Sequence, residues 1–261
     1  MILRGFADSR DGQIHYRTGG APDAPVVAFF HQTASSSAMW ERVIERLAGD
    51  FRCIAFDTPG FGASFQPESI PDLVYCADRI VEALDDLSIP SVHACGHHTG
   101  GCVALEVAAR YSGRFDSLTL IGPVVANEAE KAEYRKTFVR PFTVDAEGAF
   151  LRTAWDYLRM IGAGADLDLH LREMVDHLIA HRTMPMAFGA VWEQDVEALL
   201  KAVNVPLMLM CSETDVLWPL FERACAVRPD ATRSIVGGWD FQPDRDPDGV
   251  ADALRRFLTG K

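Results

Sequence analysis

Apolar and polar positions alternate with two different periods along most of the chain. Short apolar runs bounded by turn residues predict buried strands. They cover residues 2–7, 13–18, 26–31, 51–56, 91–95, 117–122, 206–211 and 232–236. Apolar residues at helical spacing predict helices over residues 38–47, 71–87, 101–111, 217–227 and 247–258. Strands that alternate with helices indicate a mostly parallel sheet covered by helices on both faces.

The pattern changes between residues 124 and 203, where no convincing strand occurs and about four helices are expected. An all-helical stretch between two strands is typical of an inserted cap. We therefore expect an α/β core formed by residues 1–123 and 204–261, with a helical cap at 124–203. The aromatic and methionine residues of this stretch recur at helical spacing, which favours packing inside the cap over contact with a substrate. These residues are Trp155, Met160, Met184, Met186, Phe188 and Trp192.

The composition of the chain limits the classes of molecule that it is expected to bind. Hydrophobic residues make up 48% of the chain and charged residues 24%, which is an ordinary mixture for a folded globular protein. The net charge of −12 and the absence of basic runs exclude nucleic acid and anionic membrane surfaces as partners. No apolar run is long enough to cross a bilayer, and we expect no signal peptide at the N-terminus. A small molecule is the expected partner, without a cofactor, and the number of subunits is left open.

The six cysteines are scattered, with no spacing typical of a metal site. Most of them lie inside apolar runs, so we expect buried thiols in a reducing cytoplasm.

The most informative segment is Gly-His-His-Thr-Gly-Gly at residues 96–101, between a predicted strand and a predicted helix. Small residues at 96, 100 and 101 suit a sharp corner, which pushes the side chain of His98 at its tip into a strained, exposed position. The amides of the first turn of the helix point to the same place, where they would stabilise developing negative charge.

Several ordered segments resemble one family. Residues 29–40 are similar to a strand followed by an oxyanion loop, and Asp57–Ser64 reads Asp-Thr-Pro-Gly-Phe-Gly-Ala-Ser. The corner at 96–101 resembles a nucleophile elbow. Asp215 occupies the usual place of the catalytic acid, and residues 235–247 match the segment that normally carries the catalytic histidine. On these motifs the chain resembles the α/β-hydrolase superfamily over nearly its whole length. The resemblance implies an α/β-hydrolase fold with an inserted helical cap.

Two of the three triad positions depart from that pattern. His98 stands at the elbow, where Ser, Cys or Asp is expected, and Asp240 stands where His is expected. A histidine at the elbow forms neither the acyl-enzyme of a serine esterase nor the alkyl-enzyme of a dehalogenase. Cys102 is expected to point into helix packing, and Thr99 to contribute its backbone amide. The triad of this chain is therefore degenerate.

The two replacements are nevertheless complementary. The resemblance implies that positions 98 and 240 lie within hydrogen-bonding range, so Asp240 would fix the tautomer of His98 and raise its pKa. Asp215 would add a second negative charge. The resemblance also implies that the amides of Thr33 and Thr99 are oxyanion donors. Further candidates for the binding site are Gln32 and His31 in the oxyanion loop and the pocket tryptophans Trp155, Trp192, Trp218 and Trp239.

Several functions remain open at this point. The first is an enzyme in which a His98–Asp240 general acid/base dyad hydrolyses a small ester, lactone or 1,3-diketone, or performs a lyase step on a keto acid. The second is a catalytically inactive ligand-binding protein that keeps an inert salt bridge at the site. A divalent metal held by His98, Asp215 and Asp240 is a third, less favoured alternative. His31 and His97 are expected to be structural.

Overall fold

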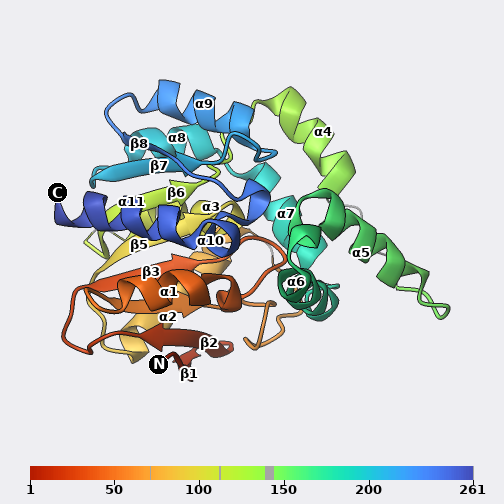
Figure 1. Cartoon of the computed structure of the whole chain (residues 1–261), viewed down its shortest axis with the longest axis horizontal. Coiled ribbons are helices and arrows are strands. Elements are labelled where there is room, and N and C mark those ends of the chain that lie inside the picture. Colours follow the sequence, from red (N-terminus) through yellow and green to blue (C-terminus); the bar gives the residue numbers. More distant parts are fainter. Residues whose placement is uncertain (71, 112, 139–143, 261) are drawn as a thin grey trace.

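The computed structural model describes residues 1–261 except 71, 112, 139–143 and 261. Its centre is an eight-stranded sheet with the strand order β1-β2-β4-β3-β5-β6-β7-β8 (Figure 1). The strands are β1 (Leu3–Ser9), β2 (Gly12–Gly19), β3 (Val26–Phe30), β4 (Arg52–Phe56), β5 (Val92–His97), β6 (Phe115–Ile121), β7 (Leu207–Cys211) and β8 (Thr232–Ile235). The eight strands expected from the sequence are confirmed, with ends that differ by a few residues.

The sheet is parallel from β4 to β8, and only its first two strands run antiparallel to their neighbours. In the central register Phe30 of β3 pairs with Phe56 of β4 on one side and with Gly96 of β5 on the other. The carboxyl ends of these strands therefore meet at one edge of the sheet. Ligand sites of open α/β sheets form at such an edge.

The central strands of the sheet contribute alternate residues to two apolar cores. Ala28 and Phe30 belong to the larger core, whereas Val27 and Phe29 belong to the other. The helices α2 (Leu73–Asp86), α3 (Thr99–Arg110) and α9 (Trp218–Val227) pack into the larger core, and α1 (Glu41–Leu47) and α11 (Pro247–Thr259) pack into the other. The sheet is covered on both faces, as its pattern of apolar strands predicts.

Only helices occur in the described residues between β6 and β7, and there are five α-helices instead of the expected four. They are α4 (Glu128–Phe138), α5 (Ala149–Met160), α6 (Leu167–Ile179), α7 (Met184–Glu193) and α8 (Val196–Ala202), with a short 3₁₀ helix, η2 (Ala163–Ala165), after α5. Helices α4 to α7 lie on the right of Figure 1, beyond the edge of the sheet. Phe241, from the segment after β8, packs with Ala154 and Leu158 of α5 and joins these helices to the rest of the molecule.

Two expected helices begin differently. The helix expected at 38–47 opens as a 3₁₀ turn, η1 (Ser37–Trp40), before α1, and α3 starts at Thr99 instead of at 101. Pro71, the expected first residue of α2, lies outside the described residues. The segment after β8 holds two short helices that the sequence did not suggest, η3 (Trp239–Phe241) and α10 (Gln242–Arg245).

All six cysteines are unpaired, and five of them are buried, as expected. Among the described residues, no helix combines the length and the apolar character that crossing a membrane requires.

Candidate active site

The tip of the turn between β5 and α3 has the geometry of a nucleophile elbow. His98 has φ 47° and ψ −112°, a conformation that is strained for a residue with a side chain. Its backbone N–H donates to the carbonyl of Ile121 at 2.9 Å, which fixes the corner against β6. A Cβ atom at Gly96 would lie 2.5 Å from the carbonyl oxygen of Gly100, so the corner requires glycine there.

The imidazole of His98 is hydrogen-bonded to Asp215, with Nε2 and Oδ2 2.9 Å apart. Asp215 follows β7, and its Oδ1 accepts the backbone N–H of Leu217 at 2.7 Å. The expected direct hydrogen bond between His98 and Asp240 is not formed. Asp240 instead accepts the backbone N–H of Val216 at 2.9 Å. An aspartate at 240 reaches less far than the histidine usual there, so the imidazole at the elbow turns to the nearer acid.

This hydrogen bond also sets the tautomer of His98. An ionised carboxylate only accepts hydrogen bonds, so Nε2 of His98 carries the proton. Among the described residues no hydrogen-bond partner takes Nδ1, and His98 lines a cavity. In the neutral ring, Nδ1 is the basic nitrogen available to a ligand.

Burial and neighbouring charges shift the pKa values of the site in opposite directions for His98 and Asp215. Burial lowers the pKa of His98, but the charge of Asp215, its hydrogen bond and the charge of Asp240 together raise this pKa above the usual value. For Asp215, burial raises the pKa, but the charge and hydrogen bond of His98 lower it to about 2. Burial and the negative charge of Asp215 raise the pKa of Asp240 to about 6. The pKa of His98 is thus shifted in the expected direction, mainly by Asp215.

A second layer behind the pair involves two fully buried residues, Gln242 and His97. The Nε2 of Gln242 donates to Oδ2 of Asp215 at 2.5 Å, and its Oε1 accepts the Nε2–H of His97 at 2.5 Å. The His97 ring stacks on the His98 ring with centroids 4.2 Å apart. Burial, followed by the charge of His98, lowers the pKa of His97 well below its usual value, so His97 is neutral. Gln242 was missed in the sequence because it belongs to no motif.

His97, His98 and Asp215 bring three potential metal-ligand atoms within 4.8 Å of one another. The two imidazole planes are nearly parallel, at 13°, so their in-plane lone pairs do not converge on one point. The Nε2 atoms of both rings are also engaged, with Gln242 and with Asp215. This arrangement does not fit a metal ion.

The expected oxyanion loop lies beside the elbow. Thr33 and Thr99 line the cavity, and no hydrogen bond within the described part of the chain occupies their backbone N–H groups. Gln32 lines the cavity as well. His31 is buried, and its Nδ1–H donates to the carbonyl of Gln32 at 2.7 Å while its Nε2 accepts the backbone N–H of Thr58 at 3.0 Å. His31 therefore holds the loop in place, as expected for a structural residue.

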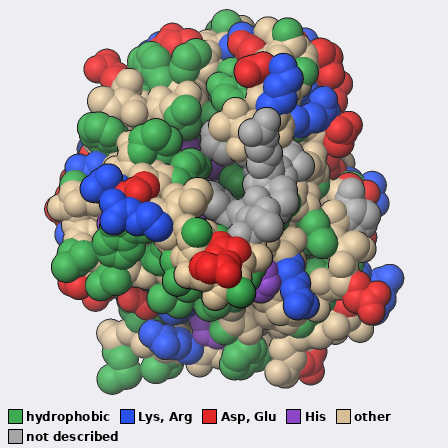
Figure 2. Space-filling model, turned by 90° about the vertical axis from the view of Figure 1, so that its right-hand side faces the viewer, with side chains coloured by type: hydrophobic (Ala, Val, Ile, Leu, Met, Phe, Trp, Pro, Cys, Tyr) green, Lys and Arg blue, Asp and Glu red, His purple; other side chains and the backbone are tan. Residues whose placement is uncertain are grey.

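The cavity has a volume of about 280 Å³, near the lower end of the range for small-molecule sites. It lies between the elbow and the helices that follow β6, and Figure 2 views the face of the molecule that those helices form. The lining residues are Gln32, Thr33, His98, Thr99, Val124, Thr137, Tyr157, Met160, Ile161, Glu173, His177, Phe188, Val191, Trp192, Val216, Leu217, Asp240 and Phe241. Most of this lining is apolar, with a few polar groups at the elbow and on α6.

Of the four candidate tryptophans, the structure brings only Trp192 to this cavity. Trp155 stacks on His170 with ring centroids 3.7 Å apart, and Trp218 packs on Phe221 at 5.1 Å. Trp239 is 45% exposed. Residue type alone could not separate these positions, because the four identical side chains differ in burial and in the rings they contact. Met160, Phe188 and Trp192, which were expected to pack inside the cap, also line the cavity.

Comparison with known proteins agrees with this geometry. Residues 25–160 match the family model described as the alpha/beta hydrolase fold. The chain belongs to the α/β-hydrolase family. Within this family it is 27% identical to the putative carbamate hydrolase RutD of a Caulobacter species, over 96% of this chain and 97% of that protein. It is 30% identical to 3-oxoadipate enol-lactonase 1 of Acinetobacter baylyi, over 79% of this chain and 78% of that protein.

Solved structures share the fold over nearly the whole chain. The enol-lactonase from Burkholderia xenovorans superimposes with a TM-score of 0.80 at 16% identity, covering 98% of this chain and 100% of that one. The bromoperoxidase from Bacillus anthracis gives a TM-score of 0.82 at 18% identity, with coverage of 98% and 100%. At these identities the likeness concerns the fold alone.

Proposed function

We propose that the protein is a hydrolase for a small carbonyl compound, an ester, lactone or carbamate, in which His98 acts as a general base without a covalent intermediate. The observation that carries the proposal is the hydrogen bond of His98 Nε2 to Asp215, which leaves Nδ1 available at the cavity. The relatives support the substrate class, since they are named as a putative carbamate hydrolase and an enol-lactonase.

The proposed reaction starts with a water molecule bound between Nδ1 of His98 and the substrate carbonyl. His98 takes one proton from this water, and the remaining hydroxide adds to the carbonyl carbon. The backbone amides of Thr33 and Thr99 receive the oxyanion. Asp215 stabilises the imidazolium that forms, because the two groups are already hydrogen-bonded. The proton then passes to the leaving group as the carbon–oxygen or carbon–nitrogen bond breaks.

Asp240 is the second acid–base group in this proposal. It lines the cavity beside His98, and its pKa is about 6. Because this pKa is close to neutral pH, the carboxyl can both donate and accept a proton there. The general acid/base dyad expected from the sequence thus becomes a set of three residues. His98 is the base, Asp215 orients it, and Asp240 supplies or receives the second proton.

Other side chains are poorer candidates for a nucleophile. The hydroxyl-bearing residues that line the described part of the cavity are threonines and a tyrosine, Thr33, Thr99, Thr137 and Tyr157. Cys102 is buried, and burial raises the pKa of its thiol to about 12. A thiol with this pKa is almost entirely protonated near pH 7 and is a weak nucleophile.

The helices between β6 and β7 act as the cap in this proposal. Residues 124–203 supply Tyr157, Glu173 and Trp192 to the cavity, whereas residues 1–123 and 204–261 supply the elbow and Asp240. Asp215, which is hydrogen-bonded to His98, also comes from residues 204–261. Substrate specificity would then be set by the cap and the reaction by the core. We keep the cytoplasm as the proposed location, in line with the six unpaired cysteines.

The test is turnover of small esters, lactones, carbamates and 3-keto acids after treatment with a serine-directed fluorophosphonate. We expect hydrolysis to continue and mass spectrometry to find no serine adduct. Stoichiometric labelling of a serine would contradict the mechanism. Decarboxylation of the keto acids without ester hydrolysis would assign lyase chemistry to the same base. No turnover of any compound would favour the ligand-binding alternative.

A further inference from the structure

The cavity has a second polar wall, formed by α6, in addition to the elbow. Glu173 of α6 lines the cavity, and its side chain is only 1% exposed. The hydroxyl of Ser35 lies 2.8 Å from both of its carboxylate oxygens, and Arg172 donates to Oε1 at 2.6 Å. The carboxylate is therefore held in one orientation by the loop after β3 and by its own helix.

Glu173 still has room for a ligand. A carboxylate offers about four acceptor lone pairs. Ser35 carries one hydroxyl proton, which its two contacts share, and Arg172 supplies one N–H. Acceptor sites therefore remain on Glu173, and a hydrogen-bond donor in the cavity would satisfy one of them.

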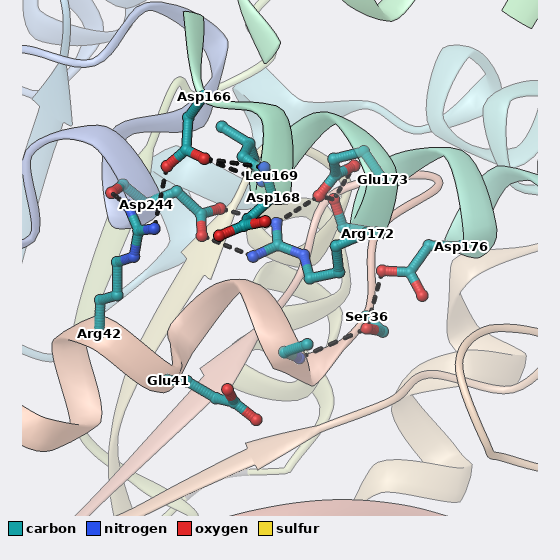
Figure 3. A network of polar contacts seen from close by, with 12 residues as sticks. Ser36, Glu41, Arg42, Asp166, Asp168, Leu169, Arg172, Glu173, Asp176 and Asp244 are labelled. Atoms are coloured by element: carbon teal, nitrogen blue, oxygen red, sulfur yellow. Dashed lines mark hydrogen bonds and ion pairs between the residues drawn. The ribbon is translucent and has the colours of Figure 1, made fainter. Parts of the chain in front are cut away.

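The positive charge near Glu173 is shared with another acid. Figure 3 shows Arg172 between the carboxylates of Glu173 and Asp244. Arg172 donates to both oxygens of Asp244, at 2.6 and 2.8 Å. One guanidinium thus faces two carboxylates. A single positive charge offsets at most one of the two negative charges.

The elbow has the same excess of acids. The imidazole of His98 interacts with the carboxylates of Asp215 and Asp240, and Asp240 itself lines the cavity. His177, which also lines the cavity, adds no charge near neutral pH, because burial lowers its pKa. Within the described residues, both polar ends of the cavity therefore carry more carboxylates than cations.

We propose that this cavity selects uncharged substrates that carry an N–H or O–H donor, and that Glu173 is the residue that recognises the donor and excludes anions. The inference deepens the proposed function, on which it rests for placing the substrate in this cavity. Neutral amides, carbamates and hydroxy-lactones have the required chemistry, whereas substrates with a free carboxylate do not. Burying an anion beside Glu173 would bring two like charges together at low dielectric.

The experiment compares three probes of nearly identical shape, phenylacetamide, benzyl methyl ketone and phenylacetate. Isothermal titration calorimetry measures their binding to the wild type and to the Glu173→Gln variant. In the wild type we expect the amide to bind more tightly than the ketone and at least tenfold more tightly than the carboxylate. In Glu173→Gln the preference for the amide over the carboxylate should fall at least fivefold.

Asp168→Asn is the matched control, because it removes an exposed carboxylate of the same helix, α6, that does not line the cavity. Its order of probe affinities should be that of the wild type. Glu173→Asp, which keeps the charge, should still reject phenylacetate. Equal affinities of the wild type for amide and carboxylate, no saturable binding of the amide, or an unchanged preference in folded Glu173→Gln would each overturn the inference.

Binding is measured here without turnover. The inference can therefore fail while His98 proves to be the base, and it can hold in a protein that does not turn over any substrate.

Discussion

The imidazole of His98 lies 2.9 Å from the carboxylate of Asp215, so the residue at the tip of the elbow is bonded directly to the acid after β7. In a Ser-His-Asp triad a histidine stands between the nucleophile and the acid. Here an imidazole itself occupies the tip, and Thr33 and Thr99 line the same cavity. The site therefore has an oriented imidazole at the tip, in place of a side chain that forms an acyl-enzyme.

Asp215→Asn should lower kcat/KM by about 10²- to 10⁴-fold, the range that misplacing or weakening a general base costs. The amide removes the charge that raises the pKa of His98, and its NH₂ group can face Nε2 and force the other tautomer. Steady-state kinetics with any substrate found in the panel measures the effect. A fall of less than fivefold would show that His98 does not depend on Asp215.

The pH dependence should identify the base. Because Asp215 and Asp240 raise the pKa of His98, kcat/KM should increase with pH through a midpoint above 6.5, where the neutral imidazole forms. In Asp240→Asn the midpoint should move to lower pH, since one of the negative charges that favour the imidazolium is gone. NMR titration of the His98 ring supplies an independent value. A His98 pKa at or below 6.5 would contradict the electrostatic argument.

Gln242 is expected to position Asp215. In Gln242→Leu, Asp215 loses a donor and His97 loses its acceptor, so stability should fall by about 1–3 kcal/mol and kcat should fall with little change in KM. The pKa of His98 should also change, because Asp215 reorients. A purely structural role of Gln242 would leave this pKa unchanged. Chemical denaturation, kinetics and NMR titration measure the three effects. An unchanged His98 pKa together with an unchanged kcat would assign Gln242 to packing alone.

The sequence was sufficient to place the elbow. Gly96 and His98 lie between an apolar strand and a helix, and local sterics determine the conformation of such a corner. The hydrogen-bond partner of His98 could not be predicted from the sequence in the same way. It depends on how far the side chains at 215 and 240 reach, and sequence spacing does not encode this reach. The His97–Gln242 hydrogen bond joins residues 145 positions apart. It depends on the short helix α10, which no pattern in the sequence predicted.

The residues that line the cavity were equally hard to predict from the sequence. Trp192 and Trp155 both lie in the helical insertion, yet only Trp192 reaches the cavity. The packing of helices against one another decides between them. Glu173 was not singled out at all, because one acidic residue on a helix is usually a solvated one. Glu173 is buried because α6 packs against the loop that carries Ser35.

Stability should depend on Asp176, which receives a hydrogen bond from Ser36. Burial, followed by the charge of Glu173, raises the pKa of Asp176 to about 8. The folded state therefore holds this proton more tightly than the unfolded chain does, and its stabilising effect is lost as pH rises through about 8. Between pH 5 and pH 9 the stability of Asp176→Asn relative to the wild type should therefore rise by about 4 kcal/mol, and the variant should be the more stable of the two at pH 9. Thermal unfolding at the two pH values measures this. A variant less stable than the wild type at pH 9 would contradict the assignment.

Whether His98 is the base is decided by kcat/KM of the wild type and of His98→Asn, measured on the best substrate of the panel. Asparagine tolerates the positive φ of the elbow but cannot take a proton there, so the variant separates chemistry from folding. His181→Asn, a change outside the cavity lining, is the control. We predict a loss of at least a hundredfold for His98→Asn, the lower end of general-base effects, and none for the control. Equal activity of a folded His98→Asn variant and the wild type would show that His98 is not the base.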